Sequence, residues 1–287
     1  MSRLYVIGNG FDRYHGIPSD YRDFAAYLRD ADPTTFRIAE EFLPVGGDGW
    51  ADFEQRLAEF DEDQAIDYAS QFHSDERHGD FQYELQQIAE ALSTRLKTHF
   101  TNWVRGLHIP QRPEVGRPLA IDPGARFLSF NYTSTLRRVY GIPPSRILHI
   151  HGSIERANED LVLGHGWERA PEDSRNFGTE GPDDDWRIRD GISYIDDFFA
   201  ATFKQTDDLI ARNFDFFGAL GDISEVLVMG HSLAPVDAAY LYEIERRTDP
   251  NALWTISVFN DLELRQERMA SLGIQPERLR FLPMDRM

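Results

Sequence analysis

Residues 4–12, LYVIGNGFD, decide the fold class of this chain. The apolar run from Leu4 to Ile7 is typical of a buried parallel strand, and it leads directly into two glycines one residue apart. Glycine allows backbone N–H groups to approach an anion closely, and a helix that starts after the turn adds a favourable dipole. The stretch therefore predicts a strand, a turn over Gly8, Asn9 and Gly10 suited to a nucleotide phosphate, and then a helix.

A tight turn without a ligand is the alternative, because glycine also serves plain turn geometry. The dinucleotide-binding fingerprint needs a third glycine, and Arg13 stands at that position. The turn therefore differs from that of an ordinary dehydrogenase.

Similar apolar runs recur along the chain, and each is followed by Gly, Asn or His and then by a helical pattern. This order is typical of parallel strands joined by crossover helices. The expected strands are Leu4 to Ile7, Arg126 to Phe130, Ile147 to Ile150, Leu161 to Leu163, Val226 to Met229, Trp254 to Phe259 and Leu279 to Leu282. They predict an α/β fold with a Rossmann-like, doubly wound and mostly parallel sheet.

The long stretch between the first two strands has helical periodicity, so we expect residues 1–287 to form one α/β domain with a helical insertion at 20–110. The clearest element is a helix from Phe81 to Leu107, whose apolar stripe is read as core, with a partner surface as the alternative. Ile192 to Leu220 predicts one or two buried helices. Glu155 to Asp190, with Asp183-Asp184-Asp185, predicts mostly loop: a solvated acidic excursion, with a metal-binding acidic cluster or a mobile cover over a site as alternatives.

Composition excludes several classes of protein. The 287 residues are 41% hydrophobic and 13% aromatic, which is enough apolar surface for a folded core. The sequence has no apolar span of about 18 residues and no signal peptide, so we expect a cytoplasmic protein without a membrane partner. The absence of cysteine excludes disulfides and a thiolate nucleophile. A net charge of -19 makes nucleic acid an unlikely partner.

Polar residues follow the second and third expected strands. Asn131 can donate and accept hydrogen bonds at once, which suits a ribose hydroxyl or an ordered water; capping of a helix that begins near Thr133 is the alternative. Strand alternation places His149 and His151 on one face, where the pair could also bind a metal. His151 is the candidate general base, since an imidazole can take a proton from an attacking water, and His149 is read as structural.

The turn after the fifth expected strand, Gly230-His231-Ser232, nearly matches the nucleophile elbow of serine hydrolases. That fold needs a histidine after the serine, and His231 is the last histidine of the chain. We therefore expect this turn, together with Asp237, to contact a nucleotide phosphate or ribose. Asp12 is expected either to stabilise developing positive charge or to fix Asn131, with a helix N-cap as the alternative.

These motifs together resemble the AbiH family of bacteriophage abortive infection proteins. They are Ile7-Gly8-Asn9-Gly10-Phe11-Asp12, His15-Gly16-Ile17-Pro18 with Tyr21 and Phe24, Trp50-Ala51-Asp52-Phe53-Glu54, Phe130-Asn131-Tyr132-Thr133, His149-Ile150-His151-Gly152, and Gly230-His231-Ser232-Leu233 with Asp237. The family in turn looks like a distant relative of the sirtuin-like NAD-consuming domains. The resemblance implies a Rossmann-like sheet with NAD as ligand.

Carried over by position, the resemblance puts Gly8 and Gly10 at the pyrophosphate, Asn131 at the nicotinamide ribose, and Gly230 and Ser232 at the adenosine half. It makes His151 the catalytic histidine. Sirtuin deacetylases carry a four-cysteine zinc module, and this chain has no cysteine, so protein deacetylation is not implied.

The leading hypothesis is cleavage of NAD at the nicotinamide–ribose bond, without a metal. Its catalytic residues are His151, Asn131 and Asp12. The expected nucleotide contacts are Gly8, Asn9, Gly10, Phe11, Gly230, His231, Ser232 and Asp237.

Two other classes stay open. One is a non-catalytic nucleotide sensor that acts through a partner. The other is a metal-dependent nucleotide or nucleic-acid hydrolase that uses His149, His151, His165, His231 and Asp237. Expected partners besides the small nucleotide are a second copy of the chain or a phage-derived activator.

Overall fold

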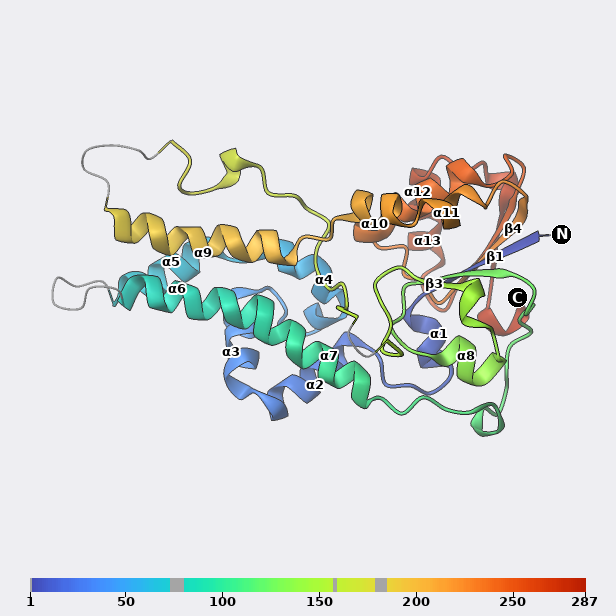
Figure 1. The fold of residues 1–287 in the computed structure, drawn as a ribbon, viewed down its shortest axis with the longest axis horizontal. Helices are drawn as coiled ribbons and strands as arrows, with labels where there is room; N and C mark the ends of the chain where they lie inside the picture. The colour runs from blue at the N-terminus through green and yellow to red at the C-terminus, as the bar shows by residue number, and fades with distance from the viewer. Residues whose placement is uncertain (1, 73–79, 157–158, 179–184) are drawn as a thin grey trace. The chain divides into compact units, whose positions relative to one another are not determined.

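The computed structural model describes residues 2–72, 80–156, 159–178 and 185–287, and the chain divides into two compact units (Figure 1). The sheet unit consists of Met1–Asp20, Val104–Val162 and Gln205–Met287, and the helical unit of Tyr21–Trp103 and Leu163–Lys204. The first segment of the helical unit lies within the expected insertion at 20–110. The second segment, Leu163–Lys204, lies outside it.

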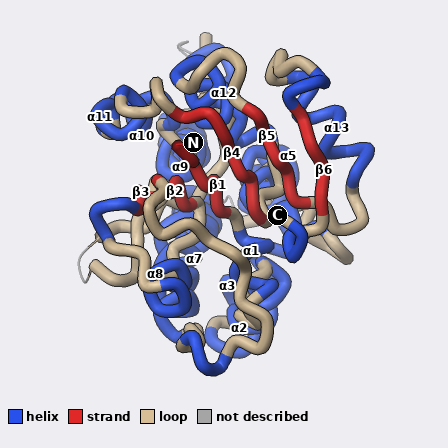
Figure 2. Tube along the Cα trace, turned by 90° about the vertical axis from the view of Figure 1, so that its right-hand side faces the viewer, coloured by secondary structure: helices blue, strands red, loops and turns tan. Residues whose placement is uncertain are grey.

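In the described residues, the sheet unit contains six strands that all run parallel. They are β1 Ser2–Ile7, β2 Arg126–Ser129, β3 Ile147–His149, β4 Ile223–Met229, β5 Leu253–Ser257 and β6 Leu279–Leu282. Figure 2 shows their order across the sheet, β3-β2-β1-β4-β5-β6. This is the strand order of the Rossmann fold, and it confirms the predicted α/β class.

Both faces of the sheet are covered, because side chains alternate along each strand. Leu4 packs with Tyr240 on one face, whereas Tyr5 packs with Phe11 on the other. The helices of the sheet unit are α1 Asn9–Tyr14, α8 Thr135–Tyr140, α10 Thr206–Arg212, α11 Phe214–Gly218, α12 Ala238–Arg247 and α13 Leu262–Ser271. After β1 the chain adds β2 and then β3 on one side of β1. It then adds β4 on the other side of β1, followed by β5 and β6. The topological switch point therefore lies between β1 and β4, where ligands of such sheets bind outside the carboxyl ends.

One predicted strand is wrong. Leu161 to Leu163 forms no strand, because Val162 hydrogen-bonds to turn residues instead of a neighbouring strand. Its N–H donates to the His151 carbonyl at 2.9 Å, and its carbonyl accepts from the Tyr132 hydroxyl at 2.7 Å. The remaining predicted strands are present with shifts at their ends, and β6 has the predicted bounds.

The helical unit contains α2 Tyr21–Ala31, α3 Pro33–Phe42, α4 Phe53–Arg56, α5 Glu62–Ser70, α6 Asp80–Glu90, most of α7 Leu96–Gly106, and α9 Trp186–Thr202. A π-helical turn, Ala91–Arg95, joins α6 to α7, so the predicted helix over Phe81 to Leu107 is confirmed. Its apolar stripe is buried core. At Gly191 of α9 a Cβ would come within 2.8 Å of the Phe81 ring, so glycine lets α9 lie close beside α6 (Figure 1).

The predicted loop over Glu155 to Asp190 is irregular where it is described, apart from a 3₁₀ turn at Pro171–Asp173 and the start of α9. Asp183 and Asp184 lie outside the described residues, whereas Asp185 caps α9 by accepting from the Arg187 N–H at 3.0 Å. The stretch Ile192 to Leu220, predicted as one or two buried helices, contains most of α9 followed by the two short helices α10 and α11, and α10 has no buried residue. None of the helices in the described part of the chain has the length and apolar character needed to cross a membrane.

Candidate functional site

Four of the predicted site segments lie at one edge of the sheet. Gly8 follows β1, Asn131 follows β2, His151 follows β3 and Gly230 follows β4. All these strands are parallel, so their carboxyl ends meet at the same edge. The structure therefore has these residues at the edge where α/β sheets bind their ligands.

The turns after β1 and β4 are packed directly onto each other. The Gly8 N–H donates to the Met229 carbonyl at 3.0 Å, and the Gly10 N–H donates to the Gly230 carbonyl at 2.7 Å. A Cβ on Gly10 would lie 2.8 Å from the Gly230 Cα, and Gly230 has a φ of 68°. These glycines are thus required for close packing between two turns. A phosphate contact at this turn stays a prediction, and the N–H groups of Gly8 and Gly10 are already used within the protein.

Asp12 is buried within α1 and binds the turn that follows β2. Its two carboxylate oxygens accept hydrogen bonds from the hydroxyls of Thr133 at 2.6 Å and Thr135 at 2.7 Å. Burial raises the pKa of Asp12 to about 6, and the hydrogen bonds from Thr133, Thr135 and Asn131 act against that rise. The N-cap of α1 is Gly8, so the alternative in which Asp12 caps a helix is wrong.

Asn131 ties the same turn to the end of β1. Its side-chain Nδ2 donates to the Gly8 carbonyl at 3.0 Å, and the side chain also hydrogen-bonds to Asp12. The following helix, α8, has Ser134 as its N-cap, so the capping alternative for Asn131 is wrong. Two roles were predicted for Asp12, stabilising a developing positive charge and holding Asn131 in position. Its hydrogen bond with Asn131 is consistent with the second. Contact of Asn131 with a ribose stays a prediction.

The two histidines at the end of β3 have different surroundings. β3 ends at His149 and His151 lies in a turn, so strand alternation does not extend to His151. The His149 Nδ1 donates to the Asn131 carbonyl at 2.8 Å, and burial lowers the pKa of His149. The ring of His151 lies 5.4 Å from Phe130 and 5.6 Å from Tyr240, measured between ring centroids.

His151 and His231 both face the carboxylate of Asp237. The His151 Nε2 is 3.9 Å from Asp237 Oδ1, and the His231 Nε2 is 3.4 Å from Asp237 Oδ2. All three residues are less than a tenth exposed. Sequence reasoning grouped His231 and Asp237 with the nucleotide contacts and did not predict that they lie beside His151. No spacing in the sequence predicts this proximity, since His151 follows β3 and His231 follows β4.

The remaining predicted nucleotide contacts differ in exposure. Ser232 is exposed, and its Oγ accepts from the Ala234 N–H at 3.3 Å. Asn9 is half-buried and accepts a hydrogen bond from Ser19, while the ring of Phe11 is buried in the core. Of this group, Ser232 and Asn9 therefore have side chains at the surface.

The histidines of the metal-dependent hypothesis do not form one cluster. His149 contacts Asn131, and His165 belongs to the helical unit, where its Nδ1 accepts from the Trp167 N–H at 3.3 Å. Over the described ranges of the chain, no group of three or more His, Asp or Glu side chains is arranged to hold a metal ion.

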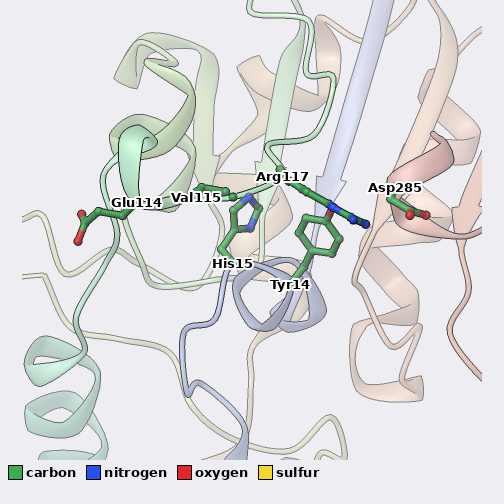
Figure 3. A pocket seen from close by; sticks show the side chains of 7 residues that line it. Tyr14, His15, Glu114, Val115, Arg117 and Asp285 are labelled. Atoms are coloured by element: carbon green, nitrogen blue, oxygen red, sulfur yellow. The ribbon is translucent and has the colours of Figure 1, made fainter.

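A cavity of 320 Å³ opens at the end of α1 (Figure 3). It is lined by Tyr14, His15, Glu114, Val115, Gly116, Arg117 and Asp285. Figure 3 shows Arg117 reaching past Tyr14 toward Asp285, while the carboxylate of Glu114 points away from them. The ring nitrogens of His15 are occupied by Phe11 and Tyr140, so the cavity offers chiefly the polar groups of Arg117 and Asp285. None of the predicted site residues lines it.

Comparison with known proteins gave one match. The family model described as bacteriophage abortive infection AbiH matches residues 4–258, from β1 to the end of β5, and includes every candidate site residue. No curated protein and no solved structure matches the chain.

Proposed function

The chain belongs to the AbiH family of bacteriophage abortive infection, and from this premise we propose that it cleaves NAD at the nicotinamide–ribose bond. Cleavage would release nicotinamide and deplete the cofactor in an infected cell. Such depletion stops metabolism in the host and hence in the phage, which accords with the role that the family name gives.

One observation carries the proposal: His151 and Asn131 lie at neighbouring strand exits on the carboxyl edge of a sheet with Rossmann strand order. Dinucleotides bind such sheets outside this edge, near the switch point. A general base and an amide able to orient a hydroxyl or water are therefore at the edge where a dinucleotide is expected.

The chemistry is that of a glycoside-type bond. The bond from the ribose carbon to nicotinamide breaks, its electron pair leaves with nicotinamide, and an oxocarbenium-like ribosyl cation forms. Water attacks this carbon while His151 accepts its proton, which gives ADP-ribose. Asn131 orients the water or a ribose hydroxyl, and Asp12 acts through Asn131, because its oxygens are engaged by Thr133 and Thr135.

The burial of the site leaves one alternative in place, a nucleotide sensor. His151 is 3% exposed and Asn131 7%, so a ligand reaches them only after a rearrangement. A defence enzyme that destroys NAD must be silent before infection, and a buried centre is compatible with that requirement. It is equally compatible with a protein that binds a nucleotide and passes the signal to a partner.

The test compares the wild-type chain with His151→Ala, both in purified form and in phage-infected cells. Cells that carry the wild-type chain should lose NAD after infection, and protein purified from those cells should release nicotinamide from NAD. His151→Ala should do neither, while His108→Ala, which changes an exposed histidine of the sheet unit, should behave as wild type.

Protection against phage with no fall in cellular NAD, together with no nicotinamide release, would reject the enzyme. Calorimetry then separates the alternatives: binding of NAD that is recovered intact after hours supports the sensor.

A further inference from the structure

We propose that Arg268 of α13 binds the diphosphate of the dinucleotide, together with the N–H and hydroxyl groups of Ser232. This rests on the proposed function in taking a dinucleotide as the ligand. The family model ends at residue 258 and α13 begins at Leu262, so the family resemblance assigns Arg268 no role.

The glycines at the switch point have no N–H group left for an anion. The N–H groups of Gly8 and Gly10 donate to backbone carbonyls, and the Gly230 N–H donates to the Ser257 hydroxyl at 2.8 Å. The chain also carries a net charge of -19, and such a field repels an incoming phosphate. A diphosphate at this edge of the sheet therefore needs a local cation, and donors other than these glycines.

Ser232 lies at the surface of the turn after β4 and offers two donors. Among the residues that the structure describes, its backbone N–H has no acceptor. Its Oγ accepts from the Ala234 N–H at 3.3 Å, and no group in the described ranges accepts the hydroxyl proton. The exposed turn can therefore donate two adjacent hydrogen bonds to an anion.

Arg268 brings a guanidinium group to the same turn. Its Nη1 donates to the Ser232 carbonyl at 2.7 Å from an exposed position of α13. Within the described part of the chain, this is the one hydrogen bond of the side chain, and no carboxylate forms an ion pair with it. A guanidinium has several further N–H donors in a planar fork that matches the oxygens of a phosphate. Arg268 thus supplies the charge that the glycines lack.

Arg265, one helical turn before Arg268, has a different task. It is buried, its Nε lies 2.7 Å from Asp261 Oδ2, and it also donates to the His231 carbonyl. Its charge is therefore balanced by Asp261, and its contact with His231 holds α13 against the turn after β4. Residues three apart lie on the same side of a helix, so this contact also fixes where Arg268 meets Ser232.

The location agrees with the path of a dinucleotide across the sheet. The Gly10 N–H donates to the Gly230 carbonyl, so the turn that carries Ser232 lies at the switch point between β1 and β4. Neighbouring strands are about 4.8 Å apart, which puts the ends of β2 and β4 roughly 10 Å from each other. With its nicotinamide ribose near Asn131, a dinucleotide would cross the switch point with its diphosphate.

The test is calorimetry on the full-length chain with two probes, ADP-ribose and inorganic pyrophosphate. In Arg268→Gln an amide can still donate to the Ser232 carbonyl, but the charge is gone. We expect the affinity for both probes to fall tenfold or more, because hydrogen bonds between charged groups are the strong ones. Arg268→Lys keeps the charge and should bind both probes more tightly than Arg268→Gln. Equal affinities of these two variants would reject a role of the charge.

Arg146→Gln is the matched control. Arg146 is also exposed and also donates to a loop carbonyl, that of Gly124 at 2.5 Å, but it precedes β3 at the amino ends of the strands. The variant loses the same charge and should bind both probes as wild type does. Three results would each overturn the proposal: no binding of either probe by wild type, wild-type affinity in Arg268→Gln, or an equal loss in Arg146→Gln.

Turnover separates this inference from the proposed function. If the chain releases nicotinamide, Arg268→Gln should raise KM for NAD about tenfold with little change in kcat, because the diphosphate is remote from the bond that breaks. Binding of ADP-ribose that depends on Arg268, in a protein that releases no nicotinamide, would support the diphosphate site and reject the enzyme. Nicotinamide release with an unchanged KM in Arg268→Gln would support the enzyme and overturn the role of Arg268.

Discussion

Gly8 and His231 touch through their backbones. A Cβ added to Gly8 would overlap the Cα of His231 and would come within 2.8 Å of the Gly230 carbonyl oxygen. The turn after β1 therefore determines how closely the turn after β4 can approach, and hence where His231 stands relative to Asp237. The first glycine of the LYVIGNGFD stretch thus has a structural task in the candidate site.

Gly8→Ala should destabilise the protein strongly. The atoms that the new methyl would meet are two backbone atoms and the Cβ of His231, none of which can move aside as the end of a flexible side chain can. Overpacking of this kind costs about 1–3 kcal/mol, and we expect the upper end of that range. Urea unfolding followed by circular dichroism measures the change.

Gly221→Ala is the matched control, because nothing lies within 4 Å of a Cβ at that position of the sheet unit. Its free energy of unfolding should stay within about 0.5 kcal/mol of wild type. Equal stability of the two variants would contradict the assigned packing of Gly8 against His231.

The strands of the sheet could be predicted because each is a short apolar run that ends in a polar residue. β6 begins and ends where the pattern does, at Leu279 and Leu282. The run at Leu161 to Leu163 has the same pattern but forms hydrogen bonds with His151 and Tyr132. A pattern of apolar residues shows that a segment is buried and does not reveal its hydrogen-bond partner, which is why this prediction failed.

For the candidate site, the sequence predicts only which residues follow the strands and therefore lie at the carboxyl edge of the sheet. Parallel strands bring their carboxyl ends to one edge, so the positions of Asn131 and His151 followed from topology. The contact of Asp237 with two histidines depends on how α12 approaches the sheet, and sequence spacing does not record that approach. The close packing of Gly8 and Gly10 on Gly230 likewise involves segments far apart in the chain. The sequence alone therefore does not distinguish a glycine turn that binds phosphate from one that packs against another turn.

Asp12 should make stability fall as pH rises through the range from about 4 to 6. Its folded pKa of about 6 lies above the ordinary value of 3.8, so in this range the native state keeps a proton that the unfolded state has lost. The free energy of unfolding then decreases with pH, and the decrease is complete above the folded pKa. The shift corresponds to roughly 3 kcal/mol.

Asp12→Asn should remove this pH dependence, because an amide does not ionise. The difference in unfolding free energy between wild type and the variant, measured by urea titrations from pH 4 to 7, should change by a few kcal/mol across the range. Asp207→Asn, at an exposed position of α10, controls for the loss of one negative charge. A difference curve for Asp12→Asn that is flat across this range would show that Asp12 ionises normally.

Tyr140→Phe should destabilise the protein by about 2 kcal/mol without affecting any turnover at His151. The Tyr140 hydroxyl donates to His15 Nε2 at 2.6 Å and accepts from the Leu119 N–H at 3.0 Å. Without this oxygen, His15 Nε2 and the Leu119 N–H each lose a hydrogen bond. A buried polar group left unsatisfied costs about 1–3 kcal/mol. Thermal unfolding measures the loss.

Tyr14→Phe removes a hydroxyl from the neighbouring exposed tyrosine, which donates to the Arg117 carbonyl at 3.2 Å. Water can replace that bond, so the variant should keep wild-type stability within about 0.5 kcal/mol. A loss of nicotinamide release in Tyr140→Phe at full stability would instead place His15 in the functional site.

Lys204 and Glu54 should show strong coupling in a double-mutant cycle. The Lys204 side chain is fully buried in the helical unit, and its Nζ lies 2.8 Å from Glu54 Oε2. Lys204→Met removes the cation that lies 2.8 Å from the Glu54 carboxylate, so it should cost about 3–5 kcal/mol. In Lys204→Met with Glu54→Gln, neither charge remains, and the combined cost should be smaller than the sum of the two single costs by about 2 kcal/mol or more. Urea unfolding of the four proteins gives the coupling energy. Additive costs would show that the two side chains contribute independently. Glu54 belongs to the Trp50 to Glu54 segment of the family resemblance, and its presence there would then need a reason other than this ion pair.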